Sequence, residues 1–281
     1  MKVRKPAVAG AFYPKDPSEL LALLRKLFVQ AGRTPMETLQ GVVSPHAGYV
    51  YAGIPQAAAI SALPEDTEVV VLLGPTHYFP FAGGALYPGE AWLTPLGEVS
   101  IDLDISQALE AALPSFFTFS EEYHGPEHSL EVIVPLLQYR LGDRFRLVPV
   151  VIGDARYDDL VEAGQVVAQV LRSTRSRGVV VASSDLYHGY SYEEGRAVDQ
   201  HTLETLQTFQ PNLFYLEVRE GRAMACGALP IVISMVASQY LGAEHVEVLA
   251  YTNSLDVLGQ RHGYFVGYAA VAFYGEKREE D

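Results

Sequence analysis

The chain has 281 residues, of which 49% are hydrophobic and 19% charged, as is ordinary for a globular protein with a sizeable core. Its formal net charge of −14 argues against binding to nucleic acid or to an anionic membrane surface, because phosphate binding requires clustered Lys and Arg. A single cysteine, Cys226, excludes an internal disulfide and is typical of a reducing cytoplasm, where we expect the protein to reside.

The first predicted helix has clear signals at both ends. Asp16, followed by Pro and Ser, predicts its start, apolar residues then recur at helical spacing, and Gly32 predicts its end. A short strand follows and ends at Ser44. A helix rich in small residues is expected over 54–63.

A run of five aliphatic residues at 69–73 predicts a strand buried on both faces, as in a parallel sheet, and Gly74 ends it. Residues 81–104 are rich in Gly, Pro and aromatic residues with partial alternation. This composition predicts an antiparallel excursion or an ordered loop. Helical spacing returns over 128–142.

The second half of the chain alternates strands with helices. We expect strands at 145–154, 178–189, 245–253 and 264–275, and helices at 157–175, 193–209 and 228–242. This alternation predicts an α/β fold with three layers (α/β/α), in which helices cover both faces of a mainly parallel central sheet. No Ser/Gly-rich linker divides the sequence, so residues 1–281 are expected to form a single domain.

Three predicted strands end in side chains that can bind a metal or transfer a proton. His46 follows the first, His77 follows the aliphatic strand, and Asp185 and His188 follow the strand that starts at 178. In an open α/β sheet, ligands bind beyond the carboxyl ends of the strands, and parallel strands bring these ends to one edge. We therefore expect the four side chains to share one rim. Taken alone, His77 would more often be a loop histidine without a role, and the other strand ends change that interpretation.

Cys226 stands just before the helix expected at 228–242. The free amides and the dipole at a helix start favour thiolate over thiol. One thiolate and two neutral imidazoles make a three-ligand face with open positions, so His46, His77 and Cys226 are candidate metal ligands. The alternative is that Cys226 is a small buried hydrophobic residue.

A further group of polar residues lies at 124–128. His124 and His128 have the i, i+4 spacing of a two-ligand helix face, but Gly125 and Pro126 between them break any helix. We expect Glu127 and His128 to lie at a helix entry close to the site, with helix capping as the alternative role. The chain contains no GxGxxG, GxxxxGK[ST], HExxH or GxSxG sequence, so no motif supports nucleotide binding or serine hydrolysis.

Seven stretches along nearly the whole chain together resemble the Memo-like family, whose bacterial and archaeal members are often called AmmeMemoRadiSam system protein B. They are VAGAFYP, SPHAGYVYAG, LLGPTHY, TPLGEVSID, EHSLEVIVPLL, SSDLYHG and ACGALP. The resemblance implies a fold shared with the class III extradiol dioxygenases of the LigB type. Those enzymes use non-haem iron(II), held by two histidines and a glutamate, and a further histidine as acid/base.

Carried over by motif, the resemblance implies that His46 and His77 are ligands and that Cys226 is the third, where the dioxygenases have a carboxylate. It also makes Asp185 and His188 residues of the site. A thiolate favours softer metals, so copper and zinc are alternatives to iron(II). Dioxygenase activity therefore does not follow from the fold.

Three functions are consistent with these residues. The first is a metal-dependent oxidoreductase with Fe(II), in which His188, Asp185, His128 and Glu127 supply acid/base groups. The second is a non-catalytic protein that binds copper or iron, or a partner, and the third is a zinc hydrolase. The expected ligand is an unknown small molecule or peptide. The system label implies functional association with a radical S-adenosylmethionine protein and an AMMECR-type protein, and a homo-oligomer is a further expectation.

Overall fold

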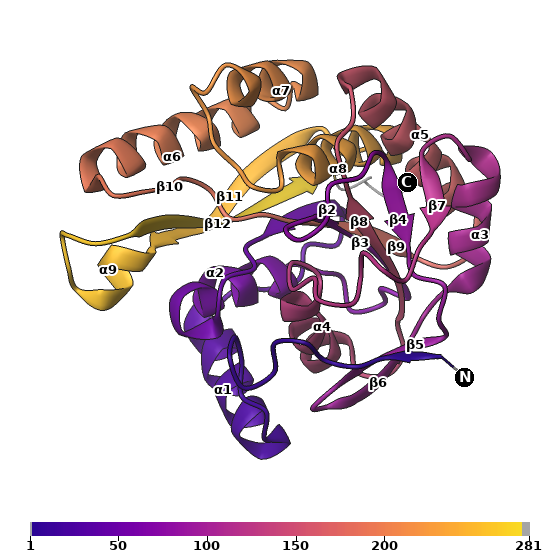
Figure 1. The fold of residues 1–281 in the computed structure, drawn as a ribbon, viewed down its shortest axis with the longest axis horizontal. Helices are drawn as coiled ribbons and strands as arrows, with labels where there is room; N and C mark the ends of the chain where they lie inside the picture. Colours follow the sequence, from indigo (N-terminus) through magenta and orange to yellow (C-terminus); the bar gives the residue numbers. More distant parts are fainter. Residues whose placement is uncertain (1, 277–281) are drawn as a thin grey trace.

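Four parallel strands form the centre of a nine-stranded sheet (Figure 1). In the computed structural model, which describes residues 2–276, these strands are, in spatial order, β2 (Leu39–Ser44), β9 (Gly178–Ser183), β3 (Val69–Pro75) and β8 (Arg146–Ile152). Every pairing among them is parallel, and Ser44 of β2 lies opposite Ser183 of β9. Their carboxyl ends therefore lie along one edge, as the sequence predicts.

Shorter and antiparallel strands extend this centre on both sides. On one side, β12 (Phe265–Tyr274) runs antiparallel to β2, to β11 (His245–Asn253) and to β10 (His188–Gly189). On the other side, β4 (Gly84–Leu86) is antiparallel to β8 and parallel to β7 (Phe117–Phe119). The sheet is thus mixed at its margins and parallel at its centre.

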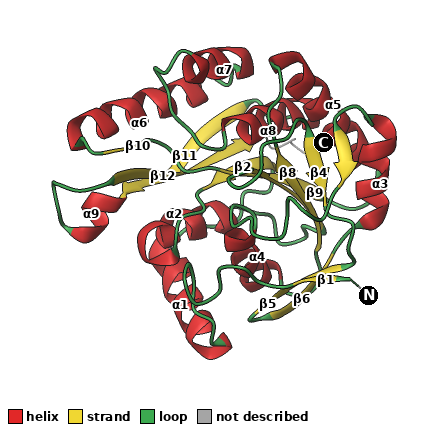
Figure 2. Ribbon diagram, in the orientation of Figure 1, coloured by secondary structure: helices red, strands yellow, loops and turns green. Residues whose placement is uncertain are grey.

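Helices cover both faces of the sheet, which confirms the predicted α/β/α architecture (Figure 2). One face carries α1 (Pro17–Ala31), α2 (Tyr49–Ser61), the 3₁₀-helix η1 (Glu131–Ile133) and α4 (Val134–Leu141). The other carries α3 (Leu103–Ala112), α5 (Tyr157–Ser173), α6 (Tyr192–Gln207), α7 (Pro211–Arg219) and α8 (Ala228–Leu241). Each face has its own apolar core, and alternate residues of β9 supply them: Val181 one core, Val180 the other.

A separate three-stranded sheet occupies the region predicted as an antiparallel excursion. β5 (Ala91–Thr94) and β6 (Gly97–Ser100) form an antiparallel hairpin, and β1 (Val3–Arg4) adds to β5 in parallel. The beginning of the chain is therefore tied to its middle.

The helix boundaries agree with the prediction in some places and differ in others. At α1 the Asp16 carboxylate accepts hydrogen bonds from the first-turn amides, and Gly32 ends the helix with a φ of 59°. α2 begins at Tyr49 rather than at residue 54 and contains Pro55, whose nitrogen cannot donate to the helix. Most residues of α2 are buried, so packing outweighs the lost hydrogen bond.

Three helices were not predicted from the sequence: α3, α7 and the short α9 (Ser254–Leu258). α7 and α9 lie beside Pro, Gly or polar residues that favour a loop, whereas α3 carries a capping Asp102 and helix-favouring residues that the sequence analysis did not use. Within residues 2–276, none of the helices has both the length and the apolar character that a membrane span requires.

Candidate metal centre

The ligand atoms of His46, His77 and Cys226 lie within 4.8 Å of one another at the carboxyl edge of the sheet. The Cys226 sulfur is 3.3 Å from Nε2 of His46. The two imidazole rings meet edge to face, with centroids 5.1 Å apart. His46 follows β2 and His77 follows β3, so these strand ends converge as the topology predicts.

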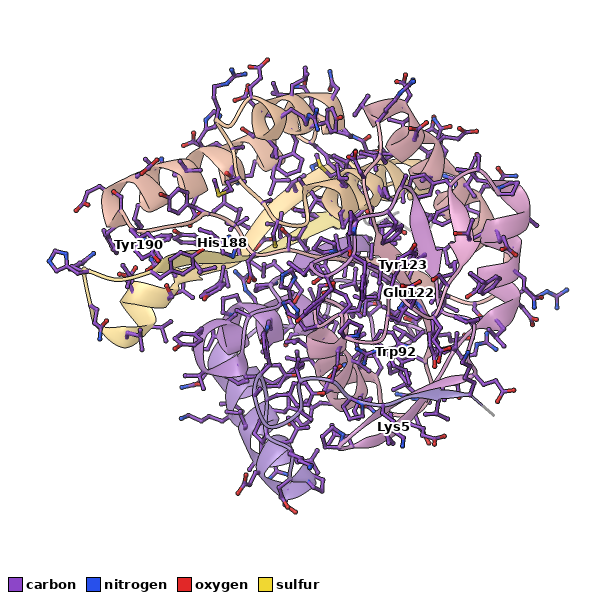
Figure 3. All side chains as sticks on the ribbon, in the orientation of Figure 1. Lys5, Trp92, Glu122, Tyr123, His188 and Tyr190 are labelled. Carbon is purple, nitrogen blue, oxygen red and sulfur yellow. The ribbon has the colours of Figure 1, made fainter. Side chains whose placement is uncertain are left out.

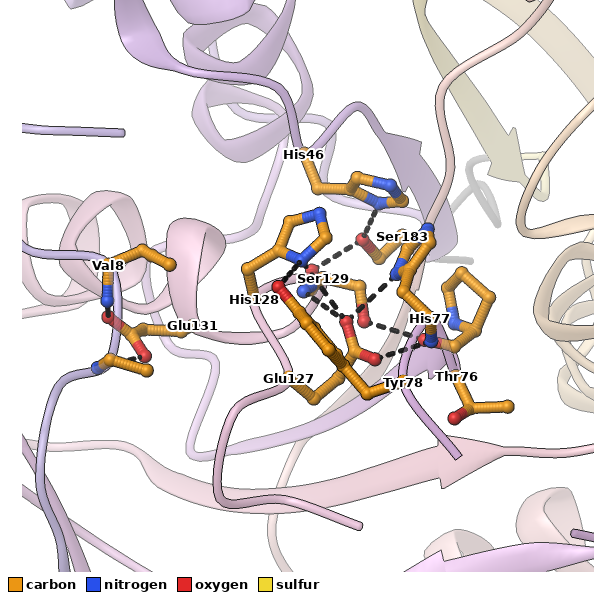
Figure 4. A network of polar contacts seen from close by, with 12 residues as sticks. Val8, His46, Thr76, His77, Tyr78, Glu127, His128, Ser129, Glu131 and Ser183 are labelled. Carbon is orange, nitrogen blue, oxygen red and sulfur yellow. Dashed lines mark hydrogen bonds and ion pairs between the residues drawn. The ribbon is translucent and has the colours of Figure 1, made fainter. Parts of the chain in front are cut away.

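The hydrogen bonds of His46 fix its tautomer. Its Nδ1 is 2.7 Å from Oγ of Ser183, and that hydroxyl donates its own proton to the Ser129 carbonyl at 2.6 Å (Figure 4). Ser183 must therefore accept a hydrogen bond from Nδ1–H, which leaves Nε2 with its lone pair, as an acceptor beside the Cys226 thiol. Burial lowers the pKa of His46 well below its usual value, with His77 and His128 adding to the effect, so the ring is neutral. A neutral imidazole is the form that binds a metal.

Glu127 orients His77 from the loop between β7 and η1. Its Oε1 is 2.9 Å from the His77 Nδ1, and its Oε2 accepts the His77 backbone amide at 2.6 Å. Burial alone would raise the pKa of Glu127, but hydrogen bonds from the His77 ring and from the Ser129 amide outweigh it and lower the pKa. The carboxylate is thus charged and holds the His77 Nδ1–H, an arrangement typical of metal-ligating histidines. Glu127 lies beside His77, in a loop and not at the helix start that the sequence analysis expected.

Two glycines permit the close approach of the segments that carry Glu127 and Cys226. A Cβ atom at Gly74, near the end of β3, would lie 2.7 Å from the Leu130 and Ser129 side chains. A Cβ atom at Gly227 would lie 2.1 Å from the carbonyl oxygen of Ser183. Larger residues at either position would push these segments away from the sheet edge.

Two hydrogen bonds join Cys226 to Asp185. The Asp185 backbone amide donates to the Cys226 sulfur at 3.2 Å, and the Cys226 amide donates to the Asp185 carbonyl at 3.1 Å. Burial raises the pKa of the Cys226 thiol to about 12, and the charge of Asp185 adds to the effect. The expectation that the start of α8 favours a thiolate is therefore wrong for the protein without a cation, because desolvation outweighs the helix end. A bound cation would favour the thiolate and release its proton.

The Asp185 side chain contacts both the backbone and the ring of His46. Its Oδ1 accepts the His46 backbone amide at 2.9 Å, and its Oδ2 is 4.0 Å from the His46 Nε2. Burial raises the pKa of Asp185 to about 7, although hydrogen bonds from the amides of His46 and Ala47 oppose this shift. The carboxyl can therefore hold or release a proton near neutral pH.

His128 packs directly against the cluster. Its ring stacks on His77 with centroids 4.6 Å apart, and its Nδ1 is 3.5 Å from both the Glu127 Oε1 and the Tyr78 hydroxyl. Phe12 covers it from the chain start, with ring centroids 5.0 Å apart. Burial lowers the pKa of His128.

His188 lies farther along the same rim, next to Tyr190 (Figure 3). Its Nδ1 is 2.9 Å from the Leu186 carbonyl, so Nδ1 carries the proton and Nε2 is free. Burial lowers its pKa, and His77 is close enough to lower it further. By contrast His124 does not belong to the site, because it is fully buried with Nε2 2.9 Å from the Ala85 carbonyl.

The residues present fit a metal ion. Ligands at 2.0–2.3 Å around a tetrahedral ion lie about 3.5 Å apart, close to the separation of the Cys226 sulfur and the His46 Nε2. Two residues that the sequence analysis missed support the cluster, Ser183 and Ser129. The only sequence signal for them is their position beside Asp185 and His128.

Comparison with known proteins identifies relatives over almost the full chain. Residues 4–272 match the sequence profile of the Memo-like protein family. A MEMO1 family protein of Methanosarcina mazei is 34% identical over 271 residues, which cover 96% of this chain and 99% of that one. A MEMO1 family protein of Archaeoglobus fulgidus is 37% identical over 275 residues, with the same coverage. The crystal structure of an uncharacterized protein of Escherichia coli K12 has a similar fold, with a TM-score of 0.57 at 15% identity over 84% of this chain and 99% of that chain.

Proposed function

The chain belongs to the Memo-like family, and from that premise we propose that it is a metal-dependent oxidoreductase in which His46, His77 and Cys226 hold the ion. The observation that carries the proposal is the orientation of the two imidazoles. Each ring has its own partner for Nδ1, Ser183 for His46 and Glu127 for His77, so both Nε2 atoms carry the lone pair that can bind an ion. At His46 the ion would replace the proton of the Cys226 thiol.

Iron(II) is the proposed metal, and the thiolate makes copper and zinc the competitors. When bound, such an ion supplies Lewis acidity and, for iron or copper, one-electron chemistry. Three protein ligands leave coordination positions for an exogenous molecule, whereas a closed structural site has four.

The groups around the ligands support catalysis more than simple storage. Asp185, with a pKa near neutrality, can exchange a proton beside His46. The free Nε2 of His188 can accept a proton at the rim, and His128 lies between Tyr78 and Glu127, where it can pass one on. A site that only stores metal needs none of these groups.

The test begins with metal analysis of protein purified without oxygen. The Fe(II) and Co(II) forms are then titrated with nitric oxide or azide, and oxygen uptake is measured with a panel of aromatic and aliphatic reductants. We expect the protein to bind about one metal ion per chain. His46→Ala and Cys226→Ser should lose this binding, whereas His262→Ala, a control at an exposed histidine, should keep it.

A spectrum that saturating azide and nitric oxide leave unchanged, together with no turnover, would contradict the oxidoreductase. The alternative, a non-catalytic copper- or iron-binding protein, would then be preferred, and the Cys226 thiol is the feature that favours it. Absence of metal binding in the wild-type protein would overturn both.

A further inference from the structure

A buried arginine outside the cluster, Arg4, holds the loop that carries Glu127. The Arg4 side chain is 4% exposed, and each of its five N–H groups has an acceptor. The shortest bonds, all 2.7 Å, go to the carbonyl oxygens of His124 and Glu127 and to the carboxylate of Glu131. The guanidinium also lies over the Trp92 ring, 4.4 Å from its centroid (Trp92 is labelled in Figure 3). No donor of Arg4 is left free to rotate toward another partner.

Glu131 completes the arrangement from the other side. Its carboxylate is 1% exposed and accepts four hydrogen bonds: from Arg4, from the backbone amides of Ala7 and Val8, and from the Tyr13 hydroxyl. Figure 4 shows Glu131 beside Val8 and, apart from them, Glu127 of the same segment paired with His77 from the end of β3. The chain start is thus bound to the loop at 124–131 although the two are about 120 positions apart.

The same residue, Glu127, is held at its backbone by Arg4 and holds His77 with its side chain. The direction in which the Glu127 carboxylate points therefore depends on where its backbone is fixed. Phe12, a few residues after the Val8 amide that Glu131 holds, contacts His128. Both groups that this loop contributes to the site are thereby coupled to the Arg4–Glu131 pair.

We propose that Arg4, paired with Glu131, is a positioning residue of the metal centre: it fixes the loop at 124–131 and, through Glu127, the orientation and tautomer of His77. The fork of the guanidinium is required, because one side chain must satisfy several carbonyl oxygens at fixed angles. The proposal rests on the proposed metal site and adds residues that touch neither the ion nor its ligands.

The test uses the cobalt(II)-loaded full-length protein, in which ring N–H protons of metal-bound histidines give shifted, exchangeable NMR signals. Ser183→Ala assigns the His46 signal and Glu127→Ala the His77 signal. In Arg4→Met we expect cobalt affinity to fall by roughly tenfold, at the lower end of outer-shell effects. We also expect the His77 N–H to exchange much faster with solvent, while the His46 N–H, held by Ser183 of β9, stays protected.

A double variant, Arg4→Met with Glu131→Leu, guards against simple unfolding. Replacing both members of a buried ion pair by apolar residues is often neutral for stability. Here it leaves the His124 and Glu127 carbonyls without their donor, and the Glu131 change also removes the acceptor of the Ala7 and Val8 amides and the Tyr13 hydroxyl. This variant should fold and still lose His77 protection. Arg140→Met is the matched control, since Arg140 is also a mostly buried arginine that donates to a backbone carbonyl, that of Leu63, and pairs with a glutamate. It should bind cobalt like the wild type.

Wild-type cobalt affinity and His77 exchange in both Arg4 variants would overturn the positioning role while leaving the metal site intact. Equal loss of the His46 and His77 signals would also overturn it, because a general collapse of the site would then explain the result. Failure of the wild-type protein to bind cobalt would instead refute the proposed function on which this role rests.

Discussion

The sulfur of Cys226 lies 3.3 Å from Nε2 of His46, although 180 positions separate the two residues in the chain. The His46 ring is held through Nδ1, and the Cys226 sulfur accepts the Asp185 backbone amide, so both groups are fixed at that place. Without a cation the Cys226 thiol can donate to the Nε2 lone pair, and a cation that displaces this proton would find both atoms in place. This relationship leads to the first prediction.

Cys226→Ser should lower affinity for Co(II) and Zn(II) by more than about 100-fold, beyond the 10–100-fold typical of outer-shell changes. Serine keeps the size of the side chain but does not supply a thiolate. Competition titration against a chelator measures the loss, and circular dichroism checks that the fold is retained. A wild-type dissociation constant in Cys226→Ser would remove Cys226 from the ligand set.

Metal binding should release protons and strengthen with pH. The pKa of Cys226 is raised to about 12 and that of Asp185 to about 7, so near neutral pH the thiol is protonated and the carboxyl can carry a proton as well. A cation lowers both pKa values, which predicts release of one to two protons per ion and tighter binding at pH 8 than at pH 6. Calorimetry in buffers with different ionisation enthalpies measures the number. Binding without proton release would show that the thiol does not ionise.

Glu127→Gln should weaken metal binding by roughly 10–100-fold without unfolding the protein. The amide keeps the shape of the side chain but removes the charge that holds the His77 Nδ1–H. Glu122→Gln, a change at an exposed residue of the same segment, serves as the control. Equal affinities for Glu127→Gln and wild type would argue that His77 is oriented by packing on His128 alone.

His188→Ala should leave metal affinity within about twofold of wild type while changing how the bound ion responds to azide, nitric oxide or a substrate. The His188 ring is fixed by the Leu186 carbonyl at the rim, and it is not among the clustered ligand atoms. A loss of affinity as large as that of His46→Ala would instead make His188 a ligand.

His124 should make the protein less stable in acid. Burial lowers its pKa to about 3, so between that value and about 6.5 the unfolded chain binds a proton at this position that the folded chain does not. The free energy of unfolding therefore falls as the pH drops through this window, by up to about 1.4 kcal/mol per pH unit for this one group. His124→Gln, whose amide can still donate to Ala85, should cost stability at pH 7 but lose less of it on acidification. Urea unfolding at several pH values measures both slopes, and parallel slopes would contradict the assignment.

Local signals in the sequence were enough to predict the parts of the fold that depend on them. Asp16 and Gly32 predict α1 because capping and the left-handed turn involve only neighbouring residues. The apolar runs predict the buried parallel strands for the same reason. α7 escaped prediction because it begins at a proline without a side-chain cap, whereas α3 has local signals, a capping Asp102 and helix-favouring residues, that the sequence analysis passed over.

For the site, the strand ends indicated which residues converge, but not how they are held. The tautomer of His46 depends on Ser183 and Ser129, and the place of the loop depends on Arg4, more than 120 positions away from Glu127. Such partners are chosen by three-dimensional packing, and no spacing in the sequence marks them. The prediction of a thiolate at Cys226 was wrong for a related reason. Burial raises the pKa of this thiol, and the degree of burial cannot be read from its position before a helix.

The in-register pairing of Ser44 with Ser183 limits which insertions and deletions leave the site intact. Because side chains alternate between the faces of a strand, deleting one residue within β9 would turn Ser183 toward the opposite helical layer. His46 would then lose its partner although every residue of the cluster was still encoded. Divergence in this fold should therefore proceed by substitution within the central strands, and insertions and deletions should be confined to the loops and the outer helices. A library of single-codon deletions, scored for metal binding, would record that boundary directly.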